Sequence, residues 1–474
     1  MSPIAWGGRP ITGRRTDAGC RARAVTVSLR VRRMNAAVWR LAGPMILSNL
    51  SIPLLGMVDS AVVGHLARPQ YLGAVAVGTT LFDALYLSLN FLRMGTTGVT
   101  AQVHGAGDNN AVRGVLGQSL MLAAVLALLL LVLQWPLRMA GLALIHPSAE
   151  VAGYTRIYFD VRIWSAPAVL ADFALLGWFL GLQNARAPLV LLLVVNGTNA
   201  VMDGVFVFGL GMNVAGVALA SVLAQYLGLG VALWLATREL RRYPGVWRRA
   251  ELLGAGRFKR LVGVNANIFV RTVSLLFAFG FFTAQSARQG DVILAANALL
   301  LNLQQVLSYG LDGLAHAVEA LAGRAIGAGD RPGFRLAVRT VIGWSLAIAA
   351  VFALIYAALG PALIRLLTDL AHVRVAAVRY LPWMVLSPFI SVWPFVFDGV
   401  YIGATRVREM RNMMLLAVLG AYLPAWFMLQ PWGNDGLWAA FMVFLAARGA
   451  GLGWLYRRIE AREGFVAAAS HGWG

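Results

Sequence analysis

Two aspartates lie inside stretches of sequence that are otherwise almost wholly apolar. Asp59 stands in LSIPLLGMVDSAVVGHL, and Asp203 stands in NGTNAVMDGVFVFGL. A carboxylate inside a membrane helix costs about 2.5–3.5 kcal/mol on insertion scales, so it is a functional candidate by default. Asn196, Asn199 and Asp203 recur at i, i+3 and i+7, which places two amides and an acid on one helical face.

The spacing also places the two acids at similar depth. Asp59 lies 19 residues beyond Arg40, about 28 Å along a helix, and Asp203 lies 17 residues beyond Arg186, about 25 Å. Carboxylate and amide oxygens suit a proton or Na⁺, a hard cation that prefers oxygen ligands. We therefore predict an ion-coupling site of Asp59, Asn196, Asn199 and Asp203, with Na⁺ as an alternative to H⁺ at Asp59, Asn199 and Asp203. The other interpretation is that these groups hydrogen-bond neighbouring helices.

Two prolines interrupt the apolar stretch that contains Asp59. Pro44 and Pro53 each remove a backbone hydrogen bond and bend a helix. A bend next to an acid would convert ion binding into movement. A static kink that improves packing is the alternative for each proline.

A second group of ionisable residues lies in the other half of the chain. Asp312, His316 and Glu319 recur at i, i+4 and i+7, and Arg271 lies about 16 Å into the preceding apolar stretch. Two interpretations remain open, a buried ion-pair lock and a gate or substrate contact.

Other charged residues fall within apolar stretches. Arg93 lies near the predicted inner end of its stretch and is expected to extend its charge to the interface. The spacing assigns no role to Asp83, Asp172 or Asp398.

Composition requires that these residues be held by membrane helices. The chain has 474 residues, of which 59% are hydrophobic and 13% are charged. A membrane span needs about 20 predominantly apolar residues. Twelve stretches qualify: 37–65, 71–94, 114–136, 153–180, 187–209, 214–237, 261–284, 292–318, 334–359, 375–401, 411–430 and 435–456. The predicted fold class is an all-α polytopic membrane protein.

The net charge of +20 indicates which loops face the cytoplasm, because cytoplasmic loops of membrane proteins carry an excess of Lys and Arg. Most of the Lys and Arg residues fall in segments that share one side if the N-terminus is cytoplasmic, so both termini are predicted to be cytoplasmic. Anionic lipid is expected at the basic loops, and a nucleic-acid partner is disfavoured. The single cysteine, Cys20, excludes an intrachain disulfide.

An internal repeat divides the spans into two halves. Displacing the sequence by 222 residues aligns HGAGD (104–108) with IGAGD (326–330) and Gly181 with Gly403. Six spans per half make the repeat parallel, and such repeats in transporters enclose a substrate path. The predicted segments are a basic tail that is disordered or precedes the true start (1–36), an N-lobe (37–237), a linker (238–260), a C-lobe (261–457) and a cytoplasmic tail (458–474).

Several segments together resemble the multidrug and toxic compound extrusion (MATE) family, and its DinF-type branch most closely. The resemblance runs from about residue 37 to 455 and rests on PMILSNLSIPLLGMVDSAVVGHL (44–66), YLGAVAVG (71–78), FLRMGTTGVTAQ (91–102), NGTNAVMDGVFVFGL (196–210) and AANALLLNLQQVLSYGLDGLAHAVEALAGRAIGAGD (295–330). It implies a twelve-helix, two-lobe antiporter that exports organic, often cationic compounds in exchange for H⁺ or Na⁺.

By the same resemblance, Asp59, Asn199 and Asp203 match the family's first-lobe cation site, and Pro44 matches the proline at which the first helix bends. Asp312 and Glu319 match a motif of the branch. The sequence NANIFVRT departs from the family because it lacks the acid expected after the first asparagine, so the charge partner of Arg271 stays open.

The sequence therefore predicts a monomeric, cation-coupled exporter of drugs or metabolites in the bacterial inner membrane, with no cofactor beyond the coupling ion. A flippase for lipids or lipid-linked oligosaccharides on the same scaffold is the alternative. A membrane-embedded enzyme is disfavoured because the chain has no HExxH or GxSxG motif. A channel is disfavoured because the two halves differ.

Overall fold

The computed structural model describes residues 29–49, 68–247, 255–462 and 464–466. Within these ranges the regular structure is helical and no strand occurs. The predictions for Pro53 and Asp59 fall outside the described residues. The first helix among these residues covers 29–49 and contains Pro44.

The first lobe follows this helix. Its elements are α2 (Pro69–Leu89), α3 (Phe91–Gly105), α4 (Asn109–Val132), α5 (Gln134–Ile145), α6 (Ala149–Arg162), the 3-10 turn η1 (Ile163–Ser165), α7 (Ala166–Gly181), α8 (Arg186–Asp203), the π-helix η2 (Gly204–Gly209) and α9 (Val214–Leu240).

The second lobe has longer helices. Its elements are α11 (Ala255–Arg288), α12 (Asp291–Gly327), α13 (Arg331–Leu367), α14 (Ala371–Gly403), α15 (Val407–Leu416), the π-helix η3 (Ala417–Tyr422), α16 (Leu423–Leu429), the 3-10 turn η4 (Gln430–Trp432) and α17 (Gly433–Arg462).

The number of spans agrees with the prediction of twelve. Ten ranges among the described residues are long and apolar enough to cross a membrane. The last of them, Val407–Arg462, contains two spans joined at η4. The helix over residues 29–49 overlaps the first predicted span, 37–65. The protein is an all-α membrane protein of twelve helices in two pseudo-symmetric lobes.

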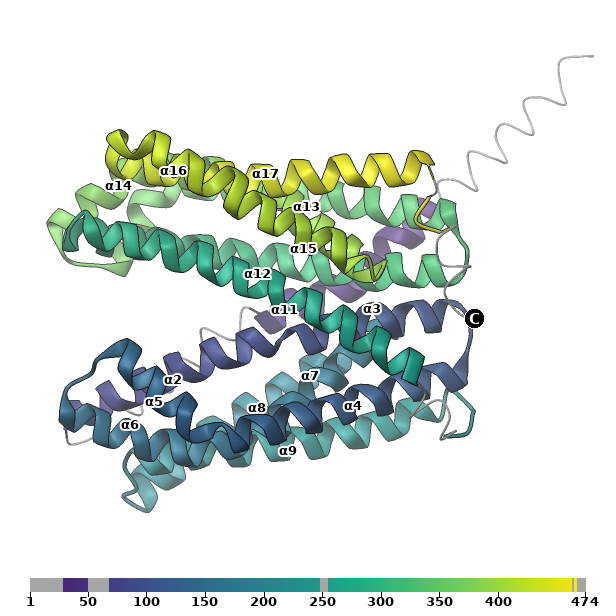
Figure 1. The fold of residues 1–474 in the computed structure, drawn as a ribbon, viewed down its shortest axis with the longest axis horizontal. Helices are drawn as coiled ribbons and strands as arrows, with labels where there is room; N and C mark the ends of the chain where they lie inside the picture. Colours follow the sequence, from purple (N-terminus) through teal and green to yellow (C-terminus); the bar gives the residue numbers. More distant parts are fainter. Residues whose placement is uncertain (1–28, 50–67, 248–254, 463, 467–474) are drawn as a thin grey trace, which may run out of the picture.

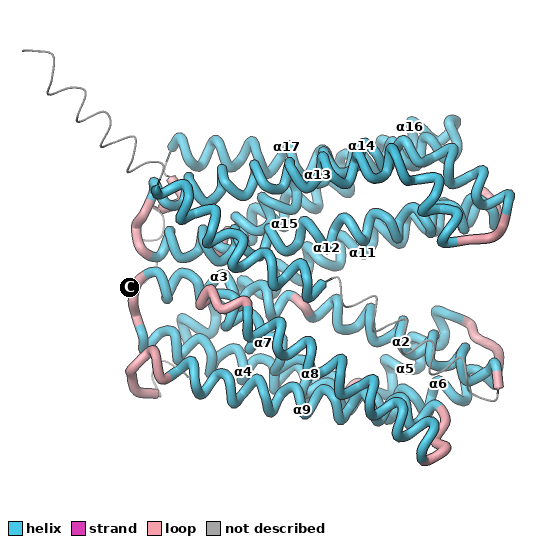
Figure 2. Tube along the Cα trace, turned by 180° about the vertical axis from the view of Figure 1, so that it is seen from behind, coloured by secondary structure: helices cyan, strands magenta, loops and turns pink. Residues whose placement is uncertain are grey.

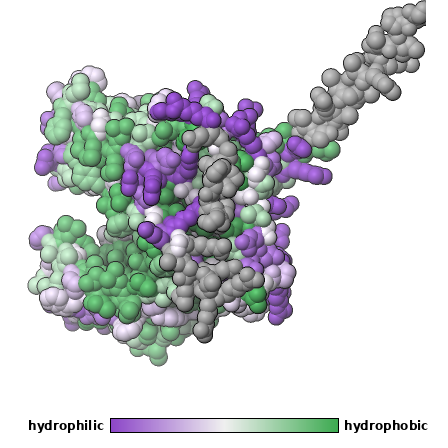
Figure 3. Space-filling view, turned by 45° about the vertical axis from the view of Figure 1, so that its right-hand side comes forward, coloured by the Kyte–Doolittle hydropathy of each residue, from purple (hydrophilic) through white to green (hydrophobic). Residues whose placement is uncertain are grey.

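The two lobes meet at one end and separate at the other. The ribbons of the first lobe (α2–α9) and the second lobe (α11–α17) converge on the side where α17 ends and diverge on the side where α17 begins (Figures 1 and 2). We call the end where the lobes converge the termini end. The space-filling surface shows a hollow between the lobes on the opposite side, at the left of Figure 3.

The first helix of each half packs against the opposite lobe. Trp39 of the first helix packs edge-on against Trp344 of α13, with ring centroids 5.0 Å apart, and the Asn49 side chain donates to the Tyr309 carbonyl at 3.3 Å. In return, Phe269 of α11 packs against Phe91 of α3, with centroids 5.7 Å apart. This exchange ties the lobes together.

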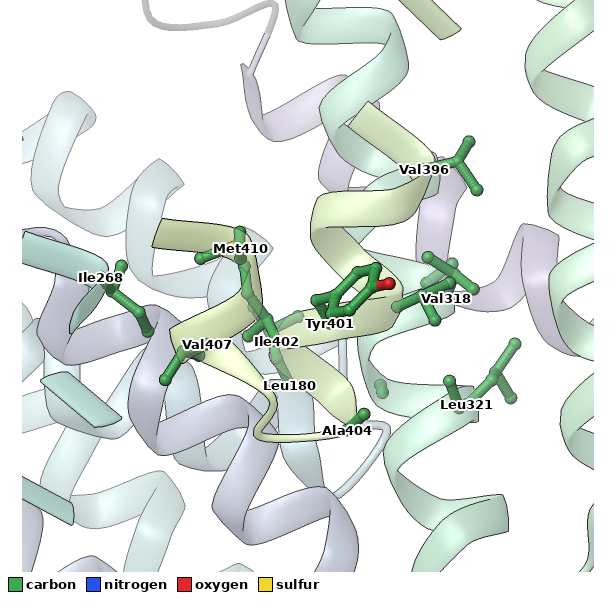
Figure 4. Close-up of a cluster of buried hydrophobic side chains, with 14 of the residues drawn as sticks. Leu180, Ile268, Val318, Leu321, Val396, Tyr401, Ile402, Ala404, Val407 and Met410 are labelled. Carbon is green, nitrogen blue, oxygen red and sulfur yellow. The ribbon is translucent and has the colours of Figure 1, made fainter. Parts of the chain in front are cut away.

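Apolar packing continues across the boundary between the lobes. One buried cluster includes Leu180 of α7, Ile268 of α11 and Ile402 of α14 (Figure 4). Backbone approach is close here, because a Cβ on Gly105 would lie 2.0 Å from the Arg324 carbonyl oxygen, and one on Gly327 would lie 1.9 Å from that of Gln102.

Candidate ion-coupling site and interlobe charge cluster

The acid predicted in the first lobe is buried at the end of α8. Asp203 has no solvent-exposed surface, and Asn199 is 5% exposed. The Asn199 amide donates to Asp203 Oδ2 at 3.2 Å. Asn196 lies one turn earlier and is partly exposed. The helical spacing therefore correctly places Asn199 beside Asp203, whereas the position of Asp59 relative to them lies outside the described residues.

The helix changes type directly after this acid. From Gly204 to Gly209 it is a π-helix, and the Leu210 amide donates to the Val205 carbonyl at 3.0 Å, five residues earlier. π-Helical turns inside α-helices occur frequently at functional sites. The wider turn at Asp203 distinguishes this point of the span from the regular helix before it.

Arg271 has a direct partner that the sequence did not assign. Both Arg271 and Arg448 donate through Nη2 to Oδ2 of Asp398, so α11, α14 and α17 meet at one carboxylate. All three side chains are buried: Arg271 is 7% exposed, Arg448 4% and Asp398 6%. Asp398 supplies the acid that NANIFVRT lacks, from another helix. The sequence signal for this site was the occurrence of charges within spans.

The acids of α12 lie between the lobes. Glu319 is 2% exposed and lies close to Thr97 of α3, whose hydroxyl donates to the Arg93 carbonyl at 2.9 Å. Asp312 is within electrostatic reach of Arg93, Arg271 and Arg448. His316, on the same face of α12, is also within electrostatic reach of Arg93.

We call this set the interlobe charge cluster. It comprises three guanidinium groups and three carboxyl groups: Arg93, Arg271, Arg448, Asp312, Glu319 and Asp398. Among the described residues, Glu319 Oε1, Asp398 Oδ1 and Arg93 Nη1 have no hydrogen-bond partner. The cluster combines opposite charges with unused donors and acceptors at the junction of five helices.

The prediction that Arg93 extends to the membrane interface is wrong. Arg93 is 8% exposed, and its Nε donates to Asn90 Oδ1 at 3.1 Å. The sequence reading ended the span at residue 94, but α3 continues to Gly105. The polar residues after Arg93, among them Thr96, Thr97 and Thr100, are buried against other helices rather than exposed in a loop.

A set of reciprocal hydrogen bonds holds the termini end of the lobes. Gln102 of α3 donates to the Gly403 carbonyl at 2.9 Å and to the Thr405 hydroxyl at 3.3 Å. Arg324 of α12 donates to Gln183 Oε1 at 2.8 Å. The two donors, Gln102 and Arg324, are 222 positions apart, and so are the two acceptors, Gln183 and Thr405, so the repeat relates both pairs. We call these four residues, Gln102, Gln183, Arg324 and Thr405, the reciprocal latch.

The described residues contain no group of three or more His, Cys, Asp or Glu side chains that would hold a metal ion. Of the predicted Na⁺ ligands, Asn199 and Asp203 lie within those ranges. The predicted Na⁺ ligand set also needs Asp59.

Comparison with known proteins agrees with this architecture. The MatE family model matches residues 44–205 and 268–427, which together exceed half of the chain. DNA damage-inducible protein F of Escherichia coli K12 is 44% identical over 426 residues, covering 89% of this chain and 92% of that protein. The chain belongs to the MatE family. It is a membrane-spanning transporter and not an enzyme.

More distant members share the MatE architecture. Multidrug resistance protein PmpM of Pseudomonas aeruginosa is 24% identical over 431 residues, covering 88% of this chain and 90% of that one. The bent form of the Vibrio cholerae MATE transporter VcmN has a TM-score of 0.80 at 19% identity, covering 94% of this chain and 100% of that one. A structure described as the outward-facing conformation of a multidrug resistance MATE family transporter has a TM-score of 0.78 at 20% identity, covering 90% and 96%.

The two segments matched by the MatE model contain most of the candidate residues. The first includes Pro44, Asn199 and Asp203, and the second includes Asp312 and Asp398. Arg448 lies beyond the second segment. Arg448, the second arginine that pairs with Asp398, therefore comes from a part of the chain that the family model does not cover.

Proposed function

We propose that this MatE-family chain is an antiporter that exports organic, cationic or amphipathic compounds and is driven by the inward movement of H⁺ or Na⁺. The coupling site would comprise Asp59, Asn196, Asn199 and Asp203. The observation that carries this proposal is the buried Asp203, which accepts a hydrogen bond from Asn199 beside a π-helical turn.

The charge state of Asp203 offers a physical route to coupling. As a carboxylate it accepts from the Asn199 amide, and its charge disfavours burial in an apolar lobe unless a cation is bound. Binding a proton or Na⁺ removes that penalty and weakens the acceptor. We propose that the first helix, bending at Pro44 and Pro53, responds to this change and alters the volume of the first lobe.

The arrangement of the lobes supports alternating access. The lobes are joined at the termini end by the reciprocal latch and separated by a hollow at the opposite side. We propose that the termini end is cytoplasmic and that the protein is a monomer in the bacterial inner membrane. In that orientation the structure corresponds to a state open to the outside.

The interlobe charge cluster would act as a gate on this path. Arg93 and Thr97 belong to the first lobe, whereas Asp312, His316 and Glu319 belong to the second. Lobe separation at the termini end would part these opposite charges. The Arg271–Asp398–Arg448 group lies within the second lobe and would move as a unit, as a buried ion-pair lock.

The basic termini end would also contact anionic lipid. Arg331 and Arg335 of α13 both donate to Glu460 of α17, at 3.1 and 2.6 Å. Arg339, Arg457 and Arg458 extend the positive charge along the same two helices. Basic residues at a cytoplasmic membrane surface attract anionic headgroups.

Transport of ethidium, a fluorescent organic cation, tests the function. Proteoliposomes containing the full chain would receive a pH gradient or a Na⁺ gradient separately. We expect one gradient to drive transport in the wild type and in Asp369→Asn, whose side chain is fully exposed, but not in Asp59→Asn or Asp203→Asn. Undiminished gradient-driven transport by both coupling-site variants would overturn the proposal.

A further inference from the structure

Asp172 is a buried carboxyl group that the proposed coupling site does not use. It lies on α7, is 7% exposed, and its Oδ1 has no hydrogen-bond partner among the described residues. A buried carboxylate without a partner is costly, so such a group generally holds a proton or binds a cation.

No described charge compensates this carboxyl. The elements packed against α7 include α3, α4, α8, α9 and α12. Among the described residues, Asp172 Oδ1 accepts no hydrogen bond from any charged group on these elements. The buried charged side chains on these elements are Arg93, Asp203, Glu239 and Glu319.

The space around Asp172 is shaped by a glycine. A Cβ placed on Gly228 of α9 would lie 3.7 Å from Asp172 Oδ2 and 2.4 Å from Val195 Cγ2 of α8. The carboxyl therefore lies at the junction of α7, α8 and α9, where the apolar Val195 side chain also borders Gly228. Na⁺ needs several oxygen ligands, so a proton is the ion that this setting favours.

The depth of Asp172 places it between Asp203 and the termini end. Gly181 and Arg186 border the same turn, so depth can be counted from there at about 1.5 Å per residue. By that count Asp172 lies about 14 Å from the turn, Asn196 about 15 Å, and Asp203 about 25 Å. Asn196 follows Val195, so the polar residues of α8 lead from Asp203 to the level of Asp172.

We propose that Asp172 is a second proton-carrying carboxyl of the first lobe, which receives the coupling proton after Asp203 and passes it toward the termini end. The step is a proton transfer through water: the Asp203 carboxyl loses H⁺, water molecules beside Asn196 and Asn199 of α8 relay it over about 11 Å, and the Asp172 carboxylate gains it. This inference rests on the proposed antiport function and adds a second residue to its ion path.

Infrared spectroscopy and transport together test this role. The full chain would be purified as wild type, Asp172→Asn and Asp160→Asn, the last being a half-exposed carboxyl on α6. We expect Asp172→Asn to lose one carboxylic-acid carbonyl band and one titrating proton, and to lose ethidium transport driven by a pH gradient. Asp160→Asn should retain all three properties of the wild type.

The outcomes separate this inference from the proposed function. The role of Asp172 would be overturned, and the proposed function kept, if Asp203→Asn lost pH-driven transport while Asp172→Asn kept both the transport and the carbonyl band. Retention in both variants would overturn the proposed function as well. Asp172→Glu keeps a carboxyl, so it should restore the titrating proton, and an Asp172→Glu protein that folds without the carbonyl band would also contradict the proposal.

Discussion

Asp398 shows how one carboxylate organises charge inside the second lobe. Two guanidinium groups from different helices donate to the same oxygen, Oδ2. Without Asp398, each arginine would be a buried cation that lacks its direct ion pair, and the penalty for an unpaired buried charge exceeds the gain from an ordinary hydrogen bond. Removing the carboxylate is therefore expected to cost more than removing either arginine.

The stability of the purified protein tests this asymmetry. Asp398→Asn strands two buried guanidinium groups and should lower the free energy of unfolding by about 3–5 kcal/mol. Arg448→Met keeps the pair between Arg271 and Asp398 and should cost less. Thermal unfolding in detergent measures both variants, and an Arg448→Met protein less stable than Asp398→Asn would contradict the central role of the carboxylate.

At this scale, the sequence could identify candidate residues but not their partners. Helical spacing correctly brought Asn199 to Asp203, because both lie on one helix. It could not find the contact between Arg271 and Asp398, which are 127 positions apart on α11 and α14. Spacing within a helix determines a shared face, whereas the neighbour of that face depends on how the helices pack.

At the scale of the elements, a buried polar network holds three helices of the second lobe. Asn297 of α12 donates to Ser286 Oγ of α11 at 2.8 Å and to Asn434 Oδ1 of α17 at 2.7 Å. Its own Oδ1 accepts from Asn434 at 3.0 Å and from Trp438 Nε1 at 2.9 Å. The network therefore satisfies both ends of the Asn297 amide in an otherwise apolar environment.

Asn297→Ala would remove the hydrogen bonds that Asn434 and Trp438 Nε1 make with Asn297, whereas the Ser286 hydroxyl would still donate to the Phe282 carbonyl. We expect a loss of about 1–3 kcal/mol in the free energy of unfolding, the typical penalty for stranding buried polar groups. Asn302→Ala is the matched control because Asn302 is exposed on the same helix and should change stability little. Equal thermal unfolding of the two variants would show that the network does not stabilise the lobe.

Helix boundaries show where sequence patterns fail at this scale. The apolar pattern correctly predicted all the spans that the described ranges contain, but it ended the second span at residue 94. The residues that follow are Gly- and Thr-rich, and the prediction assigned them to no span. In the structure they form the second half of α3, where small side chains allow α7 and α14 to approach closely.

At the scale of the whole molecule, the contact between the lobes repeats itself about the pseudo-two-fold axis. Gly105 faces the Arg324 carbonyl, and Gly327, its counterpart 222 positions later, faces the Gln102 carbonyl. Gln102 and Arg324 are also counterparts, and each donates across the boundary. The same residues therefore provide both the close approach and the hydrogen bonds of the closed end.

A side chain at either glycine should disfavour this closed end. A Cβ on Gly327 would lie 1.9 Å from a backbone oxygen, which cannot move as a flexible side chain can, so α3 and α12 must separate. Gly327→Ala should shift the population of the transporter toward states in which the termini end is open. Gly343→Ala is the control, because a Cβ there meets no atom within 4 Å.

Spin labels on opposite lobes measure this shift. Arg241 and Arg408 are exposed near the termini end, and cysteines at both positions, with Cys20 replaced by serine, would carry the labels. We expect longer distances in Gly327→Ala than in the wild type, and unchanged distances in Gly343→Ala. Gly105→Ala should reproduce the effect of Gly327→Ala, because the two contacts are reciprocal. If both interface variants kept the wild-type distances, the closed end would tolerate the added methyl groups, and close backbone approach would not control how the lobes separate.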